Sequence, residues 1–230
     1  MNNQKPLVSI VMSVYNSDKT IQNAIESILN QTYSNIEILI MNDGSSDFTS
    51  RILEKYEQQY PKITIYNNEK NIGLTKSLNI LLSKARGELI ARQDADDESM
   101  PARIEKQVSK LLDKRFDFCT TRALRMDTKG IIPNLSYFLP AKFVMKFKNP
   151  FIHGTLMIWK SAITKIGYYD EKFLFAQDYK LFNDLIDQDY KFINMSDILY
   201  SLNMKENISI NNKKEQKYFA SCVRKKIIPQ

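Results

Sequence analysis

The stretch LVSIVMSVYN at residues 7–16 decides how the rest of the sequence is interpreted. Leu7–Val14 is a nearly continuous apolar run rich in β-branched side chains, which is typical of a strand buried on both faces in a parallel sheet. Ser17 or Asp18 follows as a helix cap, and the apolar side chains of residues 21–29 recur at helical spacing. A buried strand followed at once by an amphipathic helix predicts the first unit of an α/β sheet.

The same alternation continues through the first hundred residues. Further buried strands are predicted at Ile36–Met41, Ile63–Tyr66 and Leu89–Ala91, separated by helices that begin at Asp47 and Leu74. Connections this short favour right-handed crossovers and a mostly parallel sheet sandwiched by helices. We therefore predict an α/β fold, in which ligands bind at the carboxyl ends of the strands.

Three polar clusters follow these strands, at Tyr15–Asn16, Asn42–Ser45 and Asp94–Asp97. The carboxyl ends of parallel strands meet at one edge of a sheet, so the clusters are expected to lie together. The carboxylates of Asp94–Asp97 are hard oxygen ligands that suit Mg²⁺ or Mn²⁺. By itself an acidic triplet at a strand end is also explained by a solvated turn or a helix cap, and Asp97 is expected to cap the next helix.

The six glycines form neither a GxGxxG nor a GxxxxGK[ST] pattern. The backbone cradle that many nucleotide-binding proteins use for phosphates is therefore absent from the sequence. A nucleotide bound at this edge would need another group to neutralise its phosphates. A divalent metal held by carboxylates is the expected solution.

The second half has a looser pattern and belongs to the same predicted domain. We divide the chain into residues 1–115, residues 116–204 and a basic C-terminal tail over residues 205–230. The predicted elements after Pro101 are helices over 104–112, 141–148 and 178–186, and strands over 116–126, 155–159 and 198–202.

The excess of positive over negative charge lies in the second half of the chain. The formal net charge is +7, yet residues 1–115 hold 15 basic and 15 acidic side chains, whereas residues 205–230 hold seven basic and two acidic ones. No helix-turn-helix, zinc-finger or RNA-binding aromatic signature accompanies this charge, so a nucleic-acid partner is not expected. The basic tail is either solvated or in contact with anionic lipid headgroups.

Two further features concern the compartment. No apolar stretch approaches the roughly 20 residues of a membrane helix, and neither a signal peptide nor a membrane span is predicted. The two cysteines, Cys119 and Cys222, form no disulfide framework and no zinc-ligand cluster. The expected location is the cytoplasm, with peripheral contact at the inner face of the plasma membrane.

Taken in order, these motifs closely resemble glycosyltransferase family 2 over residues 6–190. The resemblance is carried by residues 8–16, 42–47, 71–74 and 93–97, then by His153-Gly154-Thr155, Gly167–Glu171 and Ala176–Tyr179. It implies the GT-A fold, with a Rossmann-like nucleotide-sugar-binding half at 1–115 and an acceptor half at 116–204. It also implies an inverting, metal-dependent transfer of a hexose or N-acetylhexosamine from a nucleotide sugar, typically UDP-linked, to a hydroxyl of a saccharide or glycolipid. Such enzymes often serve bacterial capsule or lipopolysaccharide synthesis.

The resemblance also implies roles for residues of the nucleotide half. Tyr15 would lie against the uracil ring with Asn16 beside it, and Asp43 would accept a hydrogen bond from the base. Asp94 would lie near the ribose or sugar, and Asp96 would bind Mn²⁺ or Mg²⁺. Lys76 and Arg92 are candidate phosphate or sugar contacts, and each is equally explained as an ordinary basic residue.

In the acceptor half, the resemblance makes Asp178 the general base that takes the proton from the attacking hydroxyl. The family usually has a Glu-Asp pair there, whereas this chain has Gln177-Asp178, so the acceptor contacts must differ. Asp178 is also explained as a helix cap. His153 and Asp170 are candidate contacts of the acceptor or the diphosphate, although a single histidine in an apolar segment is more often structural.

Two other classes of function compete with this one. A metal-dependent nucleotidyltransferase would share the sheet and the acidic cluster, but would be expected to carry a glycine-rich signature near the N-terminus. A catalytically inactive sugar-nucleotide-binding module would keep Asp43 and Asp96 without a working base. Hydrolysis of a UDP-sugar in the absence of an acceptor would separate an enzyme from a binding module.

Overall fold

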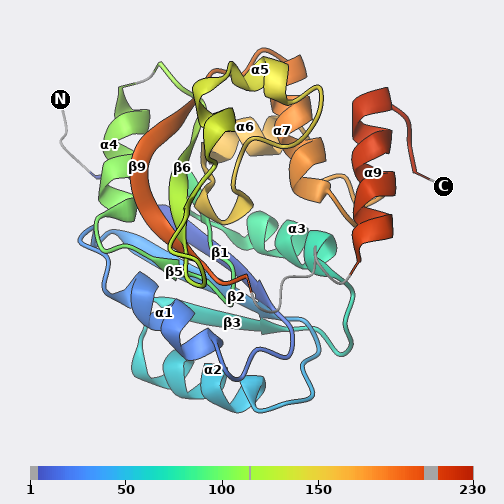
Figure 1. Cartoon of the computed structure of the whole chain (residues 1–230). Helices are drawn as coiled ribbons and strands as arrows, with labels where there is room; N and C mark the ends of the chain where they lie inside the picture. The colour runs from blue at the N-terminus through green and yellow to red at the C-terminus, as the bar shows by residue number, and fades with distance from the viewer. Residues whose placement is uncertain (1–4, 114, 205–211, 230) are drawn as a thin grey trace.

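The computed structural model describes residues 5–113, 115–204 and 212–229 of the chain (Figure 1). Its first half contains four neighbouring parallel strands, ordered β3-β2-β1-β4 across the sheet. The strands are β1 (Val8–Val14), β2 (Ile36–Asn42), β3 (Ile63–Asn67) and β4 (Leu89–Arg92). The intervening helices are α1 (Ile21–Leu29), α2 (Thr49–Gln59) and α3 (Leu74–Lys84). These elements lie where the alternating apolar pattern predicts them.

The same sheet continues in the order β8-β6-β9-β5, in which β5 comes from the first half of the chain and the other three strands from the second. β8 pairs antiparallel with both β4 and β6, whereas β6 and β9 pair in parallel. The strands are β5 (Glu98–Ser99), β6 (Phe118–Arg125), β7 (Ile131–Ile132), β8 (Met157–Trp159) and β9 (Phe192–Leu202). Because β8 joins β4 directly, the second half is placed beside the carboxyl end of β4.

Helices cover both faces of the sheet, as the sequence predicts. One buried cluster packs α1, α2 and α4 (Arg103–Leu112) against the strands. The cluster on the other face contains α3, α6 (Lys160–Lys165), α7 (Gln177–Asp187) and α9 (Lys213–Lys225). Among the described residues, the remaining helices are short: η1 (Leu135–Phe138), α5 (Ala141–Val144) and η2 (His153–Thr155). In the part of the chain that the structure describes, no helix combines the length and apolar character needed to cross a bilayer.

The region predicted as a basic tail contains a packed helix. Cys222 and Val223 of α9 are buried, and the Phe219 ring lies 6.1 Å from that of Phe173. Positions 219, 222 and 223 share one face of a helix, so they form an apolar stripe that the many lysines of this segment conceal in its composition. Residues 213–225 therefore form a helix that packs against the domain, in place of the tail that the sequence predicts. Residues 205–211 of the predicted tail lie outside the described residues.

Candidate active site

The ends of β1 and β2 support one another at the edge of the sheet where the sequence predicts a site. Tyr15 follows β1 and is half exposed. Asn16 has a φ of 47°, in the left-handed region that asparagine tolerates. Its Oδ1 accepts a hydrogen bond from the Ser46 backbone N–H (2.8 Å), and its own N–H donates to Ser45 Oγ (3.0 Å). Asn16 thus fixes the loop after β2 and leaves Tyr15 at the surface.

Asp43 organises a second loop at this edge. Its buried carboxylate accepts hydrogen bonds from the backbone N–H groups of Ile72 and Gly73 (both 2.9 Å) and from Asn68 Nδ2 (2.8 Å). This loop leads into α3, whose exposed Lys76 lies in the first turn. The structure therefore gives Asp43 a structural task, and its contact with a base remains a prediction. A carboxylate has about four acceptor positions, so one is left for a ligand.

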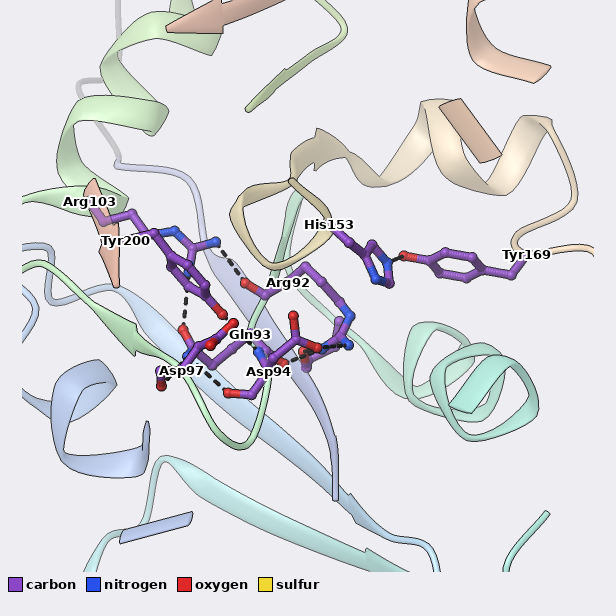
Figure 2. A network of polar contacts seen from close by, with 9 residues as sticks. Arg92, Gln93, Asp94, Asp97, Arg103, His153, Tyr169 and Tyr200 are labelled. Atoms are coloured by element: carbon purple, nitrogen blue, oxygen red, sulfur yellow. Dashed lines mark hydrogen bonds and ion pairs between the residues drawn. The ribbon is translucent and has the colours of Figure 1, made fainter. Parts of the chain in front are cut away.

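A buried arginine holds the acidic turn after β4. The Arg92 side chain is 1% exposed, and its Nη2 lies 2.5 Å from Asp94 Oδ1 (Figure 2). Arg92 also donates to the backbone carbonyls of Val11 and Gln93. The Asp94 backbone N–H donates to the Tyr200 hydroxyl of β9 (3.0 Å), so both halves of the sheet position Asp94.

Arg103 braces the same turn from α4. Its guanidinium is fully buried and donates to Gln93 Oε1 (3.1 Å), to Ser99 Oγ (2.7 Å) and to the Arg92 carbonyl (2.6 Å). It also lies over the Tyr200 ring at 5.0 Å (Figure 2). These contacts use most of its five donors, which explains how a cation is accommodated inside the protein.

Asp97 has a different role from the helix cap that the sequence predicts. The residue at the start of α4 is Ala102, whereas Asp97 is buried and accepts a hydrogen bond from the Asn203 backbone N–H (2.7 Å). Burial, with the negative charges of Asp94 and Asp96 next, raises the pKa of Asp97 to about 9. The acidic turn therefore concentrates negative charge, and one of its three carboxyl groups is held inside the protein.

The donor set of this turn fits a metal that arrives with phosphates. Within residues 5–113, 115–204 and 212–229, no three His, Cys, Asp or Glu side chains converge as a metal site. Mg²⁺, however, is commonly bound by one or two carboxylates together with substrate phosphates. Asp94 and Asp96 are both partly exposed at the strand end. They suit a cation shared with a diphosphate better than a permanently bound one.

Gly154 allows the acceptor half to approach the acidic turn closely. A Cβ atom at this position would lie 2.5 Å from the Tyr200 hydroxyl and 2.7 Å from Asp94 Oδ2. The neighbouring His153 is brought beside Arg92, and its Nε2 lies 2.7 Å from the Tyr169 hydroxyl (Figure 2). Burial, with the positive charge of Arg92 next, lowers the pKa of His153 to about 3. His153 is therefore a neutral hydrogen-bonding group near neutral pH.

Asp178 lies in the first turn of α7 and belongs to the same neighbourhood. Its Oδ2 accepts a hydrogen bond from Asn149 Nδ2 (2.7 Å). Burial is the main cause that raises the pKa of this carboxyl, and the negative charge of Asp94 acts in the same direction. Hydrogen bonds from the Tyr179 backbone and from Asn149 partly oppose the rise. The chain enters α7 through Ala176 at a φ of 53°, a conformation that is strained for alanine.

Asp170 lies apart from this group. Its Oδ1 accepts a hydrogen bond from the Lys172 backbone N–H (3.0 Å), and its Oδ2 lies 3.9 Å from Lys180 Nζ. Asp170 and Lys180 line a shallow cavity of about 540 Å³ between the Ile166–Glu171 turn and α7. The structure thus assembles Asp94, His153 and Asp178, and it places Asp170 on a separate surface.

Three residues of the site are not predicted from the sequence: Asn149, Tyr169 and Tyr200. Each meets a predicted site residue that is 16 to 106 positions away in the chain. None belongs to a motif with a chemical signature of its own. Only the occurrence of Tyr169 within the Gly167–Glu171 match gave a signal that could have identified it.

Comparison with known proteins agrees with this arrangement. The family model described as "Glycosyl transferase family 2" matches residues 9–167. EpsE of Bacillus subtilis (strain 168) is 35% identical over 209 residues, which cover 87% of this chain and 74% of EpsE. WbnJ of Escherichia coli, an O-antigen biosynthesis glycosyltransferase by name, is 34% identical over 218 residues, 92% of this chain and 82% of WbnJ.

Two solved structures share the fold at low sequence identity. Residues 1–349 of S. aureus TarS in complex with UDP-GlcNAc superimpose with a TM-score of 0.74 at 21% identity, covering 90% of this chain and 61% of that chain. Mannosyltransferase PcManGT from Pyrobaculum calidifontis, in complex with GDP-Man and Mn²⁺, gives 0.74 at 18% identity, covering 94% and 62%. These likenesses show the fold, and the family match and the relatives show the kind of enzyme: the chain belongs to glycosyltransferase family 2.

Proposed function

We propose that the protein transfers a hexose or N-acetylhexosamine from a UDP-sugar to a hydroxyl group of a saccharide or glycolipid, with inversion at the anomeric carbon. The observation that carries this proposal is the meeting of Asp178, a carboxyl whose pKa is raised, with the acidic turn at Asp94. The donor would lie over the strand ends at Tyr15, Asn16 and Lys76. The acceptor would approach from the side of Asn149.

The chemistry follows as a single displacement. Asp178 removes the proton of the acceptor hydroxyl while its oxygen forms a bond to the anomeric carbon. The bond from that carbon to the diphosphate oxygen breaks, and UDP leaves with the bonding electrons. A base is most effective when its pKa lies near the working pH, so the raised pKa of Asp178 suits this role. Asn149 and the Tyr179 backbone hold the carboxylate in place.

Asp96, with Asp94 beside it, would hold Mn²⁺ or Mg²⁺ together with the diphosphate. Such a cation neutralises the negative charge that develops on the leaving group. His153 is neutral near neutral pH, so it would contact the diphosphate or the acceptor as a hydrogen-bonding group rather than as a positive charge.

The general test is UDP release from a panel of UDP-sugars, measured with and without saccharide acceptors. UDP release that an acceptor stimulates supports a transferase. Slow UDP release without an acceptor supports an active site that hydrolyses the UDP-sugar, with water in place of the acceptor hydroxyl. Binding of UDP-sugars without any release would instead indicate an inactive binding module.

Removal of the Asp96 carboxylate should abolish the effect of metal on nucleotide binding. We expect Mn²⁺ to tighten UDP binding to the native chain by at least roughly tenfold, about 1.4 kcal/mol. Asp96→Ala should bind UDP equally with and without Mn²⁺ in calorimetric titrations. Asp197→Ala is the control, because the Asp197 carboxylate forms an ion pair with Lys106 (2.6 Å) and is not part of the acidic turn. If Asp96→Ala retains the full response to Mn²⁺, the assignment of Asp96 is wrong.

Asn149 is a positioning residue whose loss should change the pH profile. Its hydrogen bond lowers the pKa of Asp178, so Asn149→Ala should raise that pKa further. A hydrogen bond to a charged group contributes about 1.5–3 kcal/mol, and one pKa unit is about 1.4 kcal/mol. The acid limb of kcat/KM should therefore move to higher pH by about one to two units. A uniform loss of activity with no shift would contradict this role.

We also propose a role in bacterial surface-polysaccharide synthesis, at the cytoplasmic face of an anionic membrane. The name of the relative WbnJ supports the first part. The excess of basic side chains after residue 116 supports the second.

A further inference from the structure

The segment of residues 135–148, which we name the apolar-basic segment, exposes large apolar side chains. The exposed fraction is 80% for Leu135, 74% for Phe138 and 64% for Phe147, and Leu139 and Phe143 are about half exposed. Single exposed apolar residues are ordinary, but five within fourteen positions are not. The segment contains η1 and α5, which lies at the opposite end of the molecule from α2 in Figure 1.

Neighbouring contacts hold these side chains outward. Val144 and Met145 are buried, and the Tyr179 hydroxyl donates a hydrogen bond to the Met145 carbonyl. The rings of Phe143 and Phe147 lie 5.4 Å apart on the outside. The Tyr137 hydroxyl donates to the Asn194 carbonyl (3.3 Å) and ties η1 to β9. The exposed rings are therefore presented on an anchored backbone.

Positive charge accompanies this apolar surface. Lys142, Lys146 and Lys148 are exposed, and the sequence contains no acidic residue between Asp127 and Asp170. The Asp189 carboxylate lies 3.4 Å from Lys142 Nζ, across an exposed pair that solvent screens. Arg224 Nη1 donates to the Phe147 carbonyl (3.3 Å), which brings the basic C-terminal end of α9 to the same region.

We infer that the apolar-basic segment docks the protein onto a bilayer that contains anionic phospholipids. Phenylalanine and leucine side chains gain free energy by entering the boundary of the acyl chains, and lysines beside them are attracted to anionic headgroups. Neither a neutral partner nor a purely polar one would complement both features. The docking does not depend on the proposed sugar transfer, and it assigns the membrane contact proposed above to a particular segment.

The position of the segment also suits an acceptor that resides in the membrane. Its two ends border a cavity of about 480 Å³ that Asn149 lines as well. Asn149 donates to Asp178, so a glycolipid that enters this cavity from the bilayer would reach the residue that holds the base. This last step rests on the proposed function.

Vesicle co-sedimentation of the full chain tests the docking. We expect binding to vesicles that contain phosphatidylglycerol and little binding to pure phosphatidylcholine. Each lysine contributes about fivefold near an anionic surface, so removal of three positive charges weakens binding on the order of 100-fold. The triple variant Lys142→Glu, Lys146→Glu, Lys148→Glu also adds three negative charges and should lose at least that much. The double variant Phe143→Ser, Phe147→Ser should lose on the order of 10- to 100-fold.

Control variants carry changes of the same kind elsewhere. Phe48→Ser replaces a ring that is 66% exposed at the start of α2, and the triple variant Lys213→Glu, Lys214→Glu, Lys217→Glu reverses three charges on α9. Both should bind as the native chain does, and melting temperatures should confirm that all variants fold.

Four results would overturn the inference. They are native-like binding by either variant of the segment, equal binding to neutral vesicles, loss of binding only in the α9 variant, and absence of binding by the native chain. The last would be explained by a second copy of the chain if sedimentation showed a dimer that the Phe143→Ser, Phe147→Ser variant dissociates. The docking test measures no transfer, so a failure of the proposed function would not be confused with it.

Discussion

Replacing Asp178 with asparagine is expected to lower sugar transfer on the order of 10²- to 10⁴-fold, the range for loss of a positioned general base. The substitution keeps the size of the side chain, and the amide oxygen can still accept the hydrogen bond from Asn149. It removes the ability to take a proton from the acceptor. UDP binding and the melting temperature should therefore remain close to those of the native chain.

Asp170→Asn is the matched control for this experiment. Both residues are aspartates of the acceptor half, but Asp170 lies beside Lys180 and Lys172 on a separate surface. Its replacement should change turnover only slightly. If Asp178→Asn transfers sugar at the native rate and Asp170→Asn does not, the base has been misassigned.

The fold could be predicted from the sequence because its signals are local. The strands β1, β2 and β4 are short buried runs, β3 at the edge of the sheet buries only Ile63, and the helix after β1 shows its apolar stripe within about ten residues. The positions of the parallel strands in the sheet follow from the right-handed crossovers that connect them. Beyond Arg103 the strands pair over long distances, and β8 enters the sheet antiparallel between β4 and β6. No local pattern encodes that insertion.

Part of the candidate site also follows from local signals. Asp43 and Asp94 come directly after strands of one parallel sheet, so topology alone places them at the same edge. Asp178 was expected from the family resemblance instead, and the roles of all three residues stay predictions. Their hydrogen-bond partners Asn149 and Tyr200 come from distant segments and have no motif. The sequence does not reveal the helix at residues 213–225 for a different reason. Its lysines dominate the composition, whereas only two of its residues, Cys222 and Val223, are buried.

Asp94 carries the second large effect, because it is the counter-charge of a buried arginine. Asp94→Ala should lower the free energy of unfolding by about 3–5 kcal/mol in urea titrations, the range for breaking a buried ion pair. Without Asp94, the Arg92 guanidinium keeps only uncharged partners among the described residues: the carbonyls of Val11 and Gln93 and the Tyr169 hydroxyl. Those dipoles compensate a buried positive charge only in part.

A matched pair elsewhere in the chain isolates the effect of burial. Arg125 and Asp127 have the same spacing of two residues, and the Asp127 side chain is 30% exposed, much like Asp94 at 28%. Arg125 is 33% exposed, however, whereas Arg92 is 1% exposed. Asp127→Ala should therefore cost about 1 kcal/mol or less. Equal losses in the two variants would show that burial of Arg92 does not determine stability.

The charge of Asp94 should also be detectable at Asp178. Asp94→Asn keeps an acceptor for Arg92 but removes a negative charge that raises the pKa of Asp178. The acid limb of kcat/KM should then move to lower pH, opposite to the shift expected for Asn149→Ala. Because a general loss of packing would not move the two variants in opposite directions, this pair of profiles tests whether Asp94 and Asp178 share one electrostatic site. An unchanged acid limb in Asp94→Asn would show that the base lies outside the field of the acidic turn, and that Asp94 and Asp178 do not form one electrostatic site.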